Sequence, residues 1–218
     1  MRVVLWALVF VAAACARPVL YYPPGVPRRD LPREPGSTDA SKPTPVAVAT
    51  AAVVPAGEPM DADASAAVAY LHERHIIMPV AGADPAKLYD SFNDGRDGGR
   101  THHAIDILAP RGTPILAADD GRVLRMSSNT LGGITMYTVD TNGLLVYYYA
   151  HMDHYNDAMT PGRSIVKGDT LGYVGTTGDA PKNTPHLHFQ VMRWPADGKY
   201  WDGMPIDPFE ELKAATPY

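Results

Sequence analysis

The stretch that decides the fold is Thr101-His102-His103-Ala104-Ile105-Asp106, whose polar and apolar residues follow the period of a β-strand. Side chains two or four residues apart on a strand point to one face, and neighbouring side chains point to opposite faces. His102 and Asp106 should therefore share a face, while His103 should point away from it. Ile105 should also lie on the opposite face, where apolar residues can build a core. The stretch is predicted to be a half-buried strand with one functional face.

A second stretch, Pro185-His186-Leu187-His188-Phe189, follows the same period much later in the chain. His186 and His188 should share one face, and Leu187 and Phe189 the other. Pairing the two strands would bring imidazole nitrogens and a carboxylate together. Two imidazoles and one carboxylate are the ligand set of an open zinc site. Such a site leaves its fourth position to water, which is the chemistry of a hydrolase.

Several short motifs occur in an order that one protein family shares. They are His102–Asp106, Ala109–Ile115, Asp120–Val123, Tyr149–Met152 and His186–Phe189. In these motifs the chain from about Met78 to Val191 resembles the lysostaphin/LytM-type zinc peptidases, which cut the peptide bridges of bacterial peptidoglycan. The family's Gly in the first motif is Ala104 here, and the added methyl group could narrow the groove or alter substrate choice.

The resemblance implies distinct roles for the residues of these motifs. It implies that His102, Asp106 and His188 bind zinc, and that His151 and His186 are catalytic without binding the metal tightly. A neutral imidazole near the activated water can take its proton, and a second one can stabilise the developing oxyanion. The sequence leaves open which of the two histidines is the base.

Tyr149 shares a strand face with His151 if the strand is regular, so its hydroxyl could contact the substrate or the oxyanion. The alternative for Tyr149 is a packed strand aromatic beside Tyr147 and Tyr148. The remaining histidines are expected to lie outside the metal site, on the surface or facing away from the ligands: His72, His75, His103 and His154.

Composition limits the classes of protein to which the chain can belong. Its 218 residues permit one catalytic domain with extensions, and 45% of them are apolar, which is enough for a core. The net charge of −5 gives no basic footprint for nucleic acid, so no nucleic-acid partner is expected. The expected partners are peptidoglycan, from the resemblance, and a membrane, from the N-terminus.

The first 15 residues are expected to be a signal peptide that ends in a lipobox. Met1-Arg2 is a short basic start, and Val3 to Ala14 is an uncharged apolar run too short to span a bilayer. The run ends in small residues before Cys15, the only cysteine of the chain and the expected lipidation site. The expected location is the cell envelope, as an outer-membrane lipoprotein that faces the periplasm. The alternative is an ordinary signal peptide cleaved near Ala14 or Ala16.

Four segments are expected after the signal peptide. Residues 16–59 hold ten of the 21 prolines and are expected to form a disordered tether. Residues 60–77 are expected to form a linker helix that Asp61 or Asp63 caps. Residues 78–212 are expected to be the LytM-like zinc peptidase domain, and residues 213–218 a short tail.

The domain is predicted to be mainly β, with antiparallel sheets of short strands. Asn142-Gly143 between two apolar-rich runs predicts a β-hairpin. The resemblance adds a duplicated hybrid motif, with zinc at the floor of a groove between loops. Residues 205–212 are expected to form a short helix. Three aromatic residues near the C-terminus are expected to pack against the domain: Trp194, Trp201 and Phe209.

The leading hypothesis is an exported zinc endopeptidase that hydrolyses the peptide cross-links of peptidoglycan with metal-activated water. The residue spacing supports metal-assisted hydrolysis, and the substrate comes from the resemblance alone. The main alternative is a non-catalytic cell-wall-binding regulator of other peptidoglycan hydrolases. A zinc-dependent carboxypeptidase or amidase that acts on the same polymer is a third hypothesis.

Overall fold

A computed structural model describes residues 64–194 and 199–215 of the chain. The expected signal peptide, the proline-rich tether and the expected helix caps therefore lie outside the described residues. The elements of the described part follow one another in this order: α1 (Ala64–Arg74), η1 (Pro85–Lys87), β1 (Gly95–Arg96), η2 (Asp97–Gly99), β2 (Arg100–Thr101), β3 (Ile105–Leu108), β4 (Pro114–Leu116), β5 (Gly121–Asn129), β6 (Gly133–Asp140), β7 (Leu145–Tyr155), β8 (Ser164–Ile165), β9 (Thr170–Val174), β10 (His186–Arg193), β11 (Met204–Ile206) and α2 (Phe209–Ala214).

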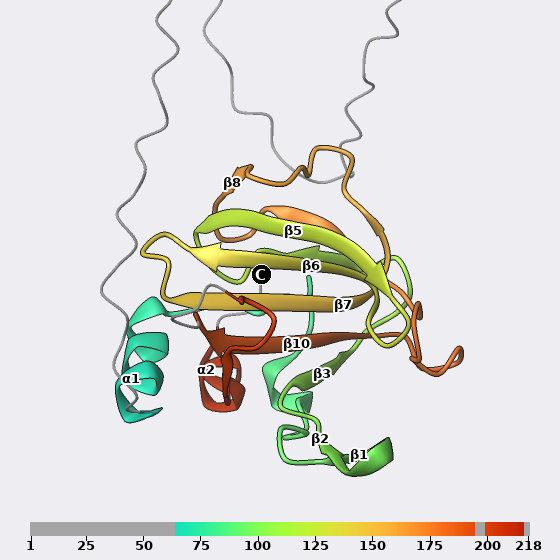
Figure 1. Ribbon diagram of the computed structural model, residues 1–218. Helices are drawn as coiled ribbons and strands as arrows, with labels where there is room; N and C mark the ends of the chain where they lie inside the picture. Colours follow the sequence, from blue (N-terminus) through green and yellow to red (C-terminus); the bar gives the residue numbers. More distant parts are fainter. Residues whose placement is uncertain (1–63, 195–198, 216–218) are drawn as a thin grey trace, which may run out of the picture. The chain divides into compact units, whose positions relative to one another are not determined.

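Within the described residues, nine strands form one antiparallel sheet in which β10 has the central role. The sheet runs in the order β11-β10-β7-β6-β5-β8, and β3 pairs with β10 beyond this path. β9 joins the sheet through β7, and β4 pairs with β9. β1 and β2 form a separate two-stranded ribbon next to β3 (Figure 1). This arrangement confirms the prediction of a mainly β fold with antiparallel strands.

The hairpin between β6 and β7 confirms the prediction made from Asn142-Gly143. Gly143 has φ +73°, a backbone conformation that side chains with a Cβ rarely adopt. The carboxylate of Asp140 holds the turn, because its Oδ1 accepts hydrogen bonds from the backbone N–H groups of Leu144 at 2.7 Å and Leu145 at 2.8 Å. The turn therefore sets the register between β6 and β7.

The main core lies against one face of the sheet. Alternate residues of the central strands are buried there, including Leu187 and Phe189 of β10 and Tyr147 of β7. The opposite face of the same strands carries His186 and His188, which are separated from the core residues by the strict alternation of a strand. One face of β10 therefore packs in the core, while the other face can carry functional side chains.

Helix α1 confirms the helix expected within residues 60–77, but it packs against this core and is therefore not a linker. Ala67 and Leu71, one turn apart, are fully buried in the core, and burying one such leucine contributes roughly 2 kcal/mol. At the end of the helix Arg74 donates from Nε and Nη2 to the buried carboxylate of Asp119, at 2.7 and 2.9 Å. Tyr147 donates to the same carboxylate at 2.8 Å, which joins the helix to β7.

The C-terminal segment differs in detail from the prediction. Its helix α2 begins at Phe209, because residues 204–206 form β11 and pair with β10. Trp194 and Phe209 are half-buried, as expected, but the side chain of Trp201 is 58% exposed. Among residues 64–194 and 199–215, neither helix is long and apolar enough to cross a membrane.

Candidate metal centre

Asp106 and His188 face each other across neighbouring strands. They are direct partners in the register between β3 and β10, and Asp106 Oδ1 lies 3.2 Å from His188 Nδ1. This pairing is the one that the strand periods of the two sequence motifs predict. It brings together two side chains that lie 82 residues apart in the chain.

His102 reaches the same place by a different route from the predicted one. It precedes β3, and the next residue, His103, has φ +56°, so the chain turns where a regular strand was expected. The turn is fixed by backbone bonds from His102 to Asp94 O at 2.9 Å and from His103 to Phe92 O at 2.8 Å. The prediction of one face for His102 and Asp106 therefore holds, but its strand argument is wrong for His102.

Ser91 orders this turn, and sequence reasoning missed it. Its hydroxyl donates to Ala104 O at 3.2 Å and accepts from the backbone N–H of Asp106 at 3.1 Å. Its carbonyl oxygen lies 2.8 Å from His102 Nδ1, which must carry the proton of that contact. One buried serine thus orients two of the expected metal ligands, and nothing in the motif spacing indicates it.

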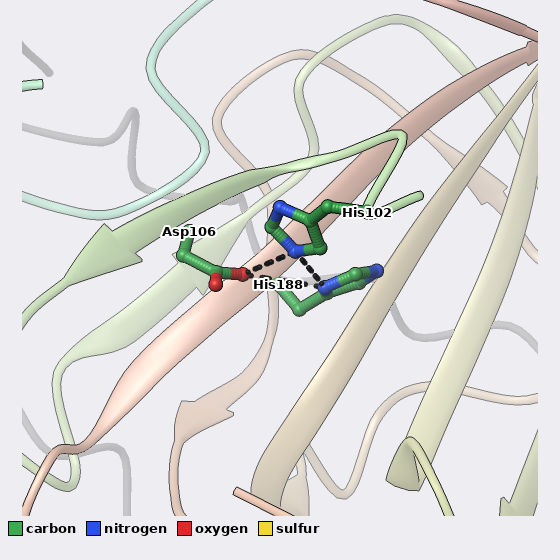
Figure 2. A group of neighbouring side chains, drawn as sticks. All are labelled: His102, Asp106 and His188. Carbon is green, nitrogen blue, oxygen red and sulfur yellow. Dashed lines mark hydrogen bonds and ion pairs between the residues drawn. The ribbon is translucent and has the colours of Figure 1, made fainter. Parts of the chain in front are cut away.

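Three donor atoms converge at the centre (Figure 2), and they come from His102, Asp106 and His188. The three lie within 4.8 Å of one another, with His102 Nε2 2.9 Å from His188 Nδ1 and 3.0 Å from Asp106 Oδ1. Because Ser91 holds the proton of His102 on Nδ1, His102 Nε2 is an acceptor beside His188 Nδ1 and the Asp106 carboxylate. Two imidazole nitrogens and a carboxylate oxygen so close together fit a cation, and this donor set suits Zn²⁺.

The electrostatics of the three groups also suit a cation. Burial by itself would raise the pKa of the Asp106 carboxyl, but the contacts with His102 and His188 outweigh it and hold that pKa well below its usual value. Burial lowers the pKa of His188. The carboxylate is therefore charged and the His188 imidazole favours its neutral form, which is the protonation state that a metal ligand needs.

Arg96 of β1 contacts the far side of the Asp106 carboxylate. Its Nη2 donates to Oδ2 at 2.6 Å, while Oδ1 faces the two imidazoles. A hydrogen bond of this kind fixes the orientation of a ligating carboxylate and leaves one oxygen for the metal. Arg96 is a second functional residue that sequence reasoning missed.

His151 and His186 lie beside the three donor atoms but outside that group. Their ring centroids are 4.9 Å apart, and His186 Nε2 lies 3.8 Å from Asp106 Oδ1. Each ring directs Nδ1 at a backbone carbonyl at 2.8 Å, that of Thr177 for His151 and that of Thr184 for His186. Each therefore keeps its Nε2 available, and burial lowers the pKa of His151 to about 4, so this ring is neutral near pH 7.

A β-bulge in β7 turns His151 towards the site. Three steps along β7, from Tyr149 to Met152, oppose two steps along β6, so β7 contains one extra residue there. His151 has φ +59°, and its backbone N–H donates to Gly132 O at 2.8 Å instead of continuing the regular ladder. Bulges commonly re-aim a side chain in this way. Ala150 and His151 thus both avoid the core face.

Tyr149 lies in the core with Tyr147 by the regular alternation of β7, and the bulge turns His151 away from that face, so the predicted substrate or oxyanion contact is wrong. Tyr149 is fully buried, and its hydroxyl accepts a hydrogen bond from the backbone N–H of Ala118 at 3.1 Å. This is the packed-aromatic alternative. The tyrosine that borders the site is Tyr148, whose ring centroid lies 5.9 Å from that of His188.

The other singled-out residues lie outside the cluster. His103 is half-buried with its ring 5.6 Å from Phe92, and His72 and His75 are exposed. His154 is exposed as expected, but it lies within β7 and stacks on Tyr173. Ala104 is fully buried and does not line the groove, so its methyl group does not narrow the groove.

An open groove of about 490 Å³ lies above the three donor atoms. Its floor is the outer face of β10 and β7, where the side chains of His188, Gln190 and Tyr148 lie. One wall carries Arg96 and Arg100, and another comes from the segment 179–184 and the turn at Leu131. A peptide can enter such a groove from solvent and lie across the cluster of histidines.

Known proteins resemble the chain in sequence and in fold. The model of Peptidase family M23 matches residues 100–208. The glycyl-glycine endopeptidase ALE-1 of Staphylococcus capitis is 30% identical over 128 residues, which are 58% of this chain and 33% of the relative. The peptidoglycan DD-endopeptidase ShyC of Vibrio cholerae is 33% identical over 93 residues, 43% of this chain and 20% of the relative. The chain thus spans a third or less of the length of these relatives.

A solved structure agrees with the predicted LytM-like architecture. The crystal structure of a lytM protein from Ruminococcus gnavus superposes with a TM-score of 0.57 at 24% identity, covering 70% of this chain and 64% of that one. The agreement confirms the fold expected from the sequence motifs.

Proposed function

The chain belongs to peptidase family M23, and from this premise we propose that it is a zinc-dependent endopeptidase that hydrolyses peptide cross-links of bacterial peptidoglycan. One observation carries the proposal: the donor atoms of His102, Asp106 and His188 lie within 4.8 Å of one another at the floor of an open groove. The relatives support the substrate class, since their names describe endopeptidases of glycyl-glycine bonds and of peptidoglycan.

In this proposal His102, Asp106 and His188 hold the zinc ion. Zinc supplies Lewis-acid chemistry, which makes water a stronger nucleophile at neutral pH and polarises a carbonyl group. Ser91 and Arg96 keep His102 and Asp106 in the orientation that binding requires, through the contacts at 2.8 and 2.6 Å.

His151 and His186 move protons. Each has its Nδ1 directed at a carbonyl, so each can accept a proton at Nε2 or, once protonated, donate from Nε2. Because the ring centroids lie only 4.9 Å apart, one ring can act as the base while the other donates to the developing oxyanion. The low pKa of His151 supports a neutral imidazole in the resting protein. The groove floor, with Tyr148 and Gln190, positions the peptide.

Digestion of peptidoglycan tests the proposal. The full-length protein is incubated with purified peptidoglycan in the presence of Zn²⁺, or of a chelator, and the soluble fragments are identified by mass spectrometry. We expect new termini within the peptides that disappear with the chelator and return when Zn²⁺ is added back. Binding to peptidoglycan that resists the chelator and gives no fragments would instead support a regulator without catalytic activity.

We also propose that the protein is exported and attached to a membrane of the cell envelope through Cys15. The support is the sequence alone, in which a short apolar run leads to small residues and the single cysteine. In cells fed a radiolabelled fatty acid, the wild-type chain should incorporate the label and move with the membrane fraction. The Cys15→Ser variant should lose both properties, and an unlabelled wild-type chain would contradict the anchor.

A further inference from the structure

The ribbon of β1 and β2 carries two arginines in direct opposition. Arg96 and Arg100 are Cα partners in the antiparallel register, so their side chains leave the same face of the ribbon. Like charges in such positions repel each other and destabilise the pair. Both side chains nevertheless line the groove above the metal centre. Because the two arginines lie in this unfavourable position beside the groove, we infer that their positive charge has a functional role.

The two arginines differ in how their charges are balanced. Arg96 forms an ion pair with Asp106 at 2.6 Å. Arg100 is exposed, and its Nε donates to the backbone oxygen of Asp97 at 3.2 Å. Within residues 64–194 and 199–215, no carboxylate forms an ion pair with Arg100. The terminal nitrogens of the Arg100 guanidinium group thus remain available to an anion. They lie next to Arg96, which already binds the Asp106 carboxylate.

The opposite wall of the groove has the opposite charge. Asp179 lines it, and the backbone N–H of Asp179 donates to Leu131 O at 2.9 Å, which ties this wall to the turn between β5 and β6. The sheet order places β3 on one side of β10, with β7 and then β6 on the other. The groove therefore runs from a positive wall at the β1–β2 ribbon to a negative one at Asp179, and this polarity orients a charged peptide.

We propose that Arg100, beside Arg96, binds a free carboxylate of the substrate peptide close to the bond that is cut. This inference rests on the proposed function and narrows its substrate class to peptides that carry a free carboxylate near that bond, in preference to uncharged oligoglycine bridges. The planar guanidinium group can donate two parallel hydrogen bonds to a carboxylate, which gives direction as well as attraction. Arg96 is a positioning residue for Asp106, and Arg100 is the residue that determines specificity.

Binding to the metal-free protein tests this subsite without reference to hydrolysis. The probes are a cross-linked peptide released from peptidoglycan, with its carboxylates free, and the same peptide with all carboxylates converted to amides. The zinc is removed with a chelator so that a carboxylate of the peptide cannot bind to the metal instead of to Arg100. Calorimetry should give a dissociation constant for the free-carboxylate form that is about 10- to 100-fold lower, the range expected for a hydrogen-bonded charge pair.

Three variants sharpen the result. Arg100→Gln should reduce the preference for the carboxylate form to about one, and Arg100→Lys should keep part of it because a charge remains without the fork of two donors. Arg111→Gln, the same substitution at an exposed arginine that pairs with Asp153 and does not line the groove, is the matched control and should keep the full preference. Equal binding of the two peptides by the wild-type protein, no binding of either, or an unchanged preference in Arg100→Gln would overturn the proposal.

The two proposals fail separately. If peptidoglycan is not cut but the carboxylate preference depends on Arg100, the endopeptidase proposal fails and the subsite stands as a binding site. If peptidoglycan is cut in a zinc-dependent way and Arg100→Gln keeps the carboxylate preference, the subsite alone fails.

Discussion

Strands β10 and β7 both supply histidines to the same site, but they do so by different means. β10 is regular, and its alternation places His186 and His188 on the outer face while Leu187 lies in the core. β7 is interrupted by a bulge at His151, whose positive φ aims a side chain that regular alternation would have placed in the core. In a regular strand such as β10, the alternation of the sequence predicts which side chains share a face. In β7 the bulge interrupts this alternation at His151, so the sequence predicts the wrong face for that residue.

The largest expected effect is a loss of zinc affinity when β10 is changed, and the two histidines of this strand should differ in it. His188→Ala should weaken zinc binding by more than about 100-fold, because it removes a direct ligand where even outer contacts are worth 10- to 100-fold. His186→Ala, two residues away, should keep most of the zinc. The zinc dissociation constants, measured by competition with a chromogenic chelator, check this contrast. The role assignment would be reversed if His186→Ala lost the metal and His188→Ala kept it.

Turnover should depend on the bulged strand as strongly as on the regular one. His151→Ala and His186→Ala should each lower kcat by about 100- to 10,000-fold, the usual contribution of a positioned acid or base, with zinc content preserved. Release of peptide fragments and zinc content are measured on the same samples. His103→Ala is the matched control, since His103 adjoins a ligand but lies outside the groove, and it should keep its zinc. A fully active His151→Ala variant would show that β7 supplies no catalytic side chain.

The ion pair between Arg96 and the ligand Asp106 should also contribute to zinc binding. Arg96→Gln should weaken zinc binding by about 10- to 100-fold, because Oδ2 of Asp106 loses the donor that fixes the carboxylate. Arg111→Gln, an exposed arginine paired with Asp153 away from the centre, is the control and should bind zinc normally. Equal zinc affinity in the two variants would show that Arg96 does not position Asp106.

The smallest effect concerns the bulge itself, measured as the free energy of unfolding of the metal-free protein in denaturant. At position 151, glycine should be more stable than valine by about 1–2 kcal/mol, since φ is positive there. At His154, in the same strand but without a positive φ, valine should be more stable than glycine by about 0.5–1 kcal/mol. The same order at both positions would argue against a strained backbone at His151.

The sequence predicted those parts of the fold that depend on period and turn chemistry. The hairpin at Asn142-Gly143 and the facing positions of Asp106 and His188 follow from such rules, and the structure contains both. The spacing of Ala67 and Leu71, four residues apart on one helix face, also indicates that α1 packs against a core, although the helix was expected to be a linker.

The errors share a physical cause. Tyr149 and His151 do not share a face as a regular strand predicts, because a bulge adds one residue to the strand without any glycine or proline to mark it. Ser91 and Arg96 could not be identified, because their contacts with His102 and Asp106 depend on how a loop folds back. Tertiary structure, and not local pattern, determines such contacts.

The most direct test is a crystal structure of the zinc-loaded protein, with the metal located from its anomalous scattering. The account predicts one zinc ion bonded to His102 Nε2 and His188 Nδ1 at about 2.0–2.1 Å and to Asp106 Oδ1 at about 2.0–2.2 Å, with His151 and His186 not bonded to it. A zinc ion that lies beyond bonding distance of any of the three atoms, or one bound by His151 and His186 in their place, would contradict it.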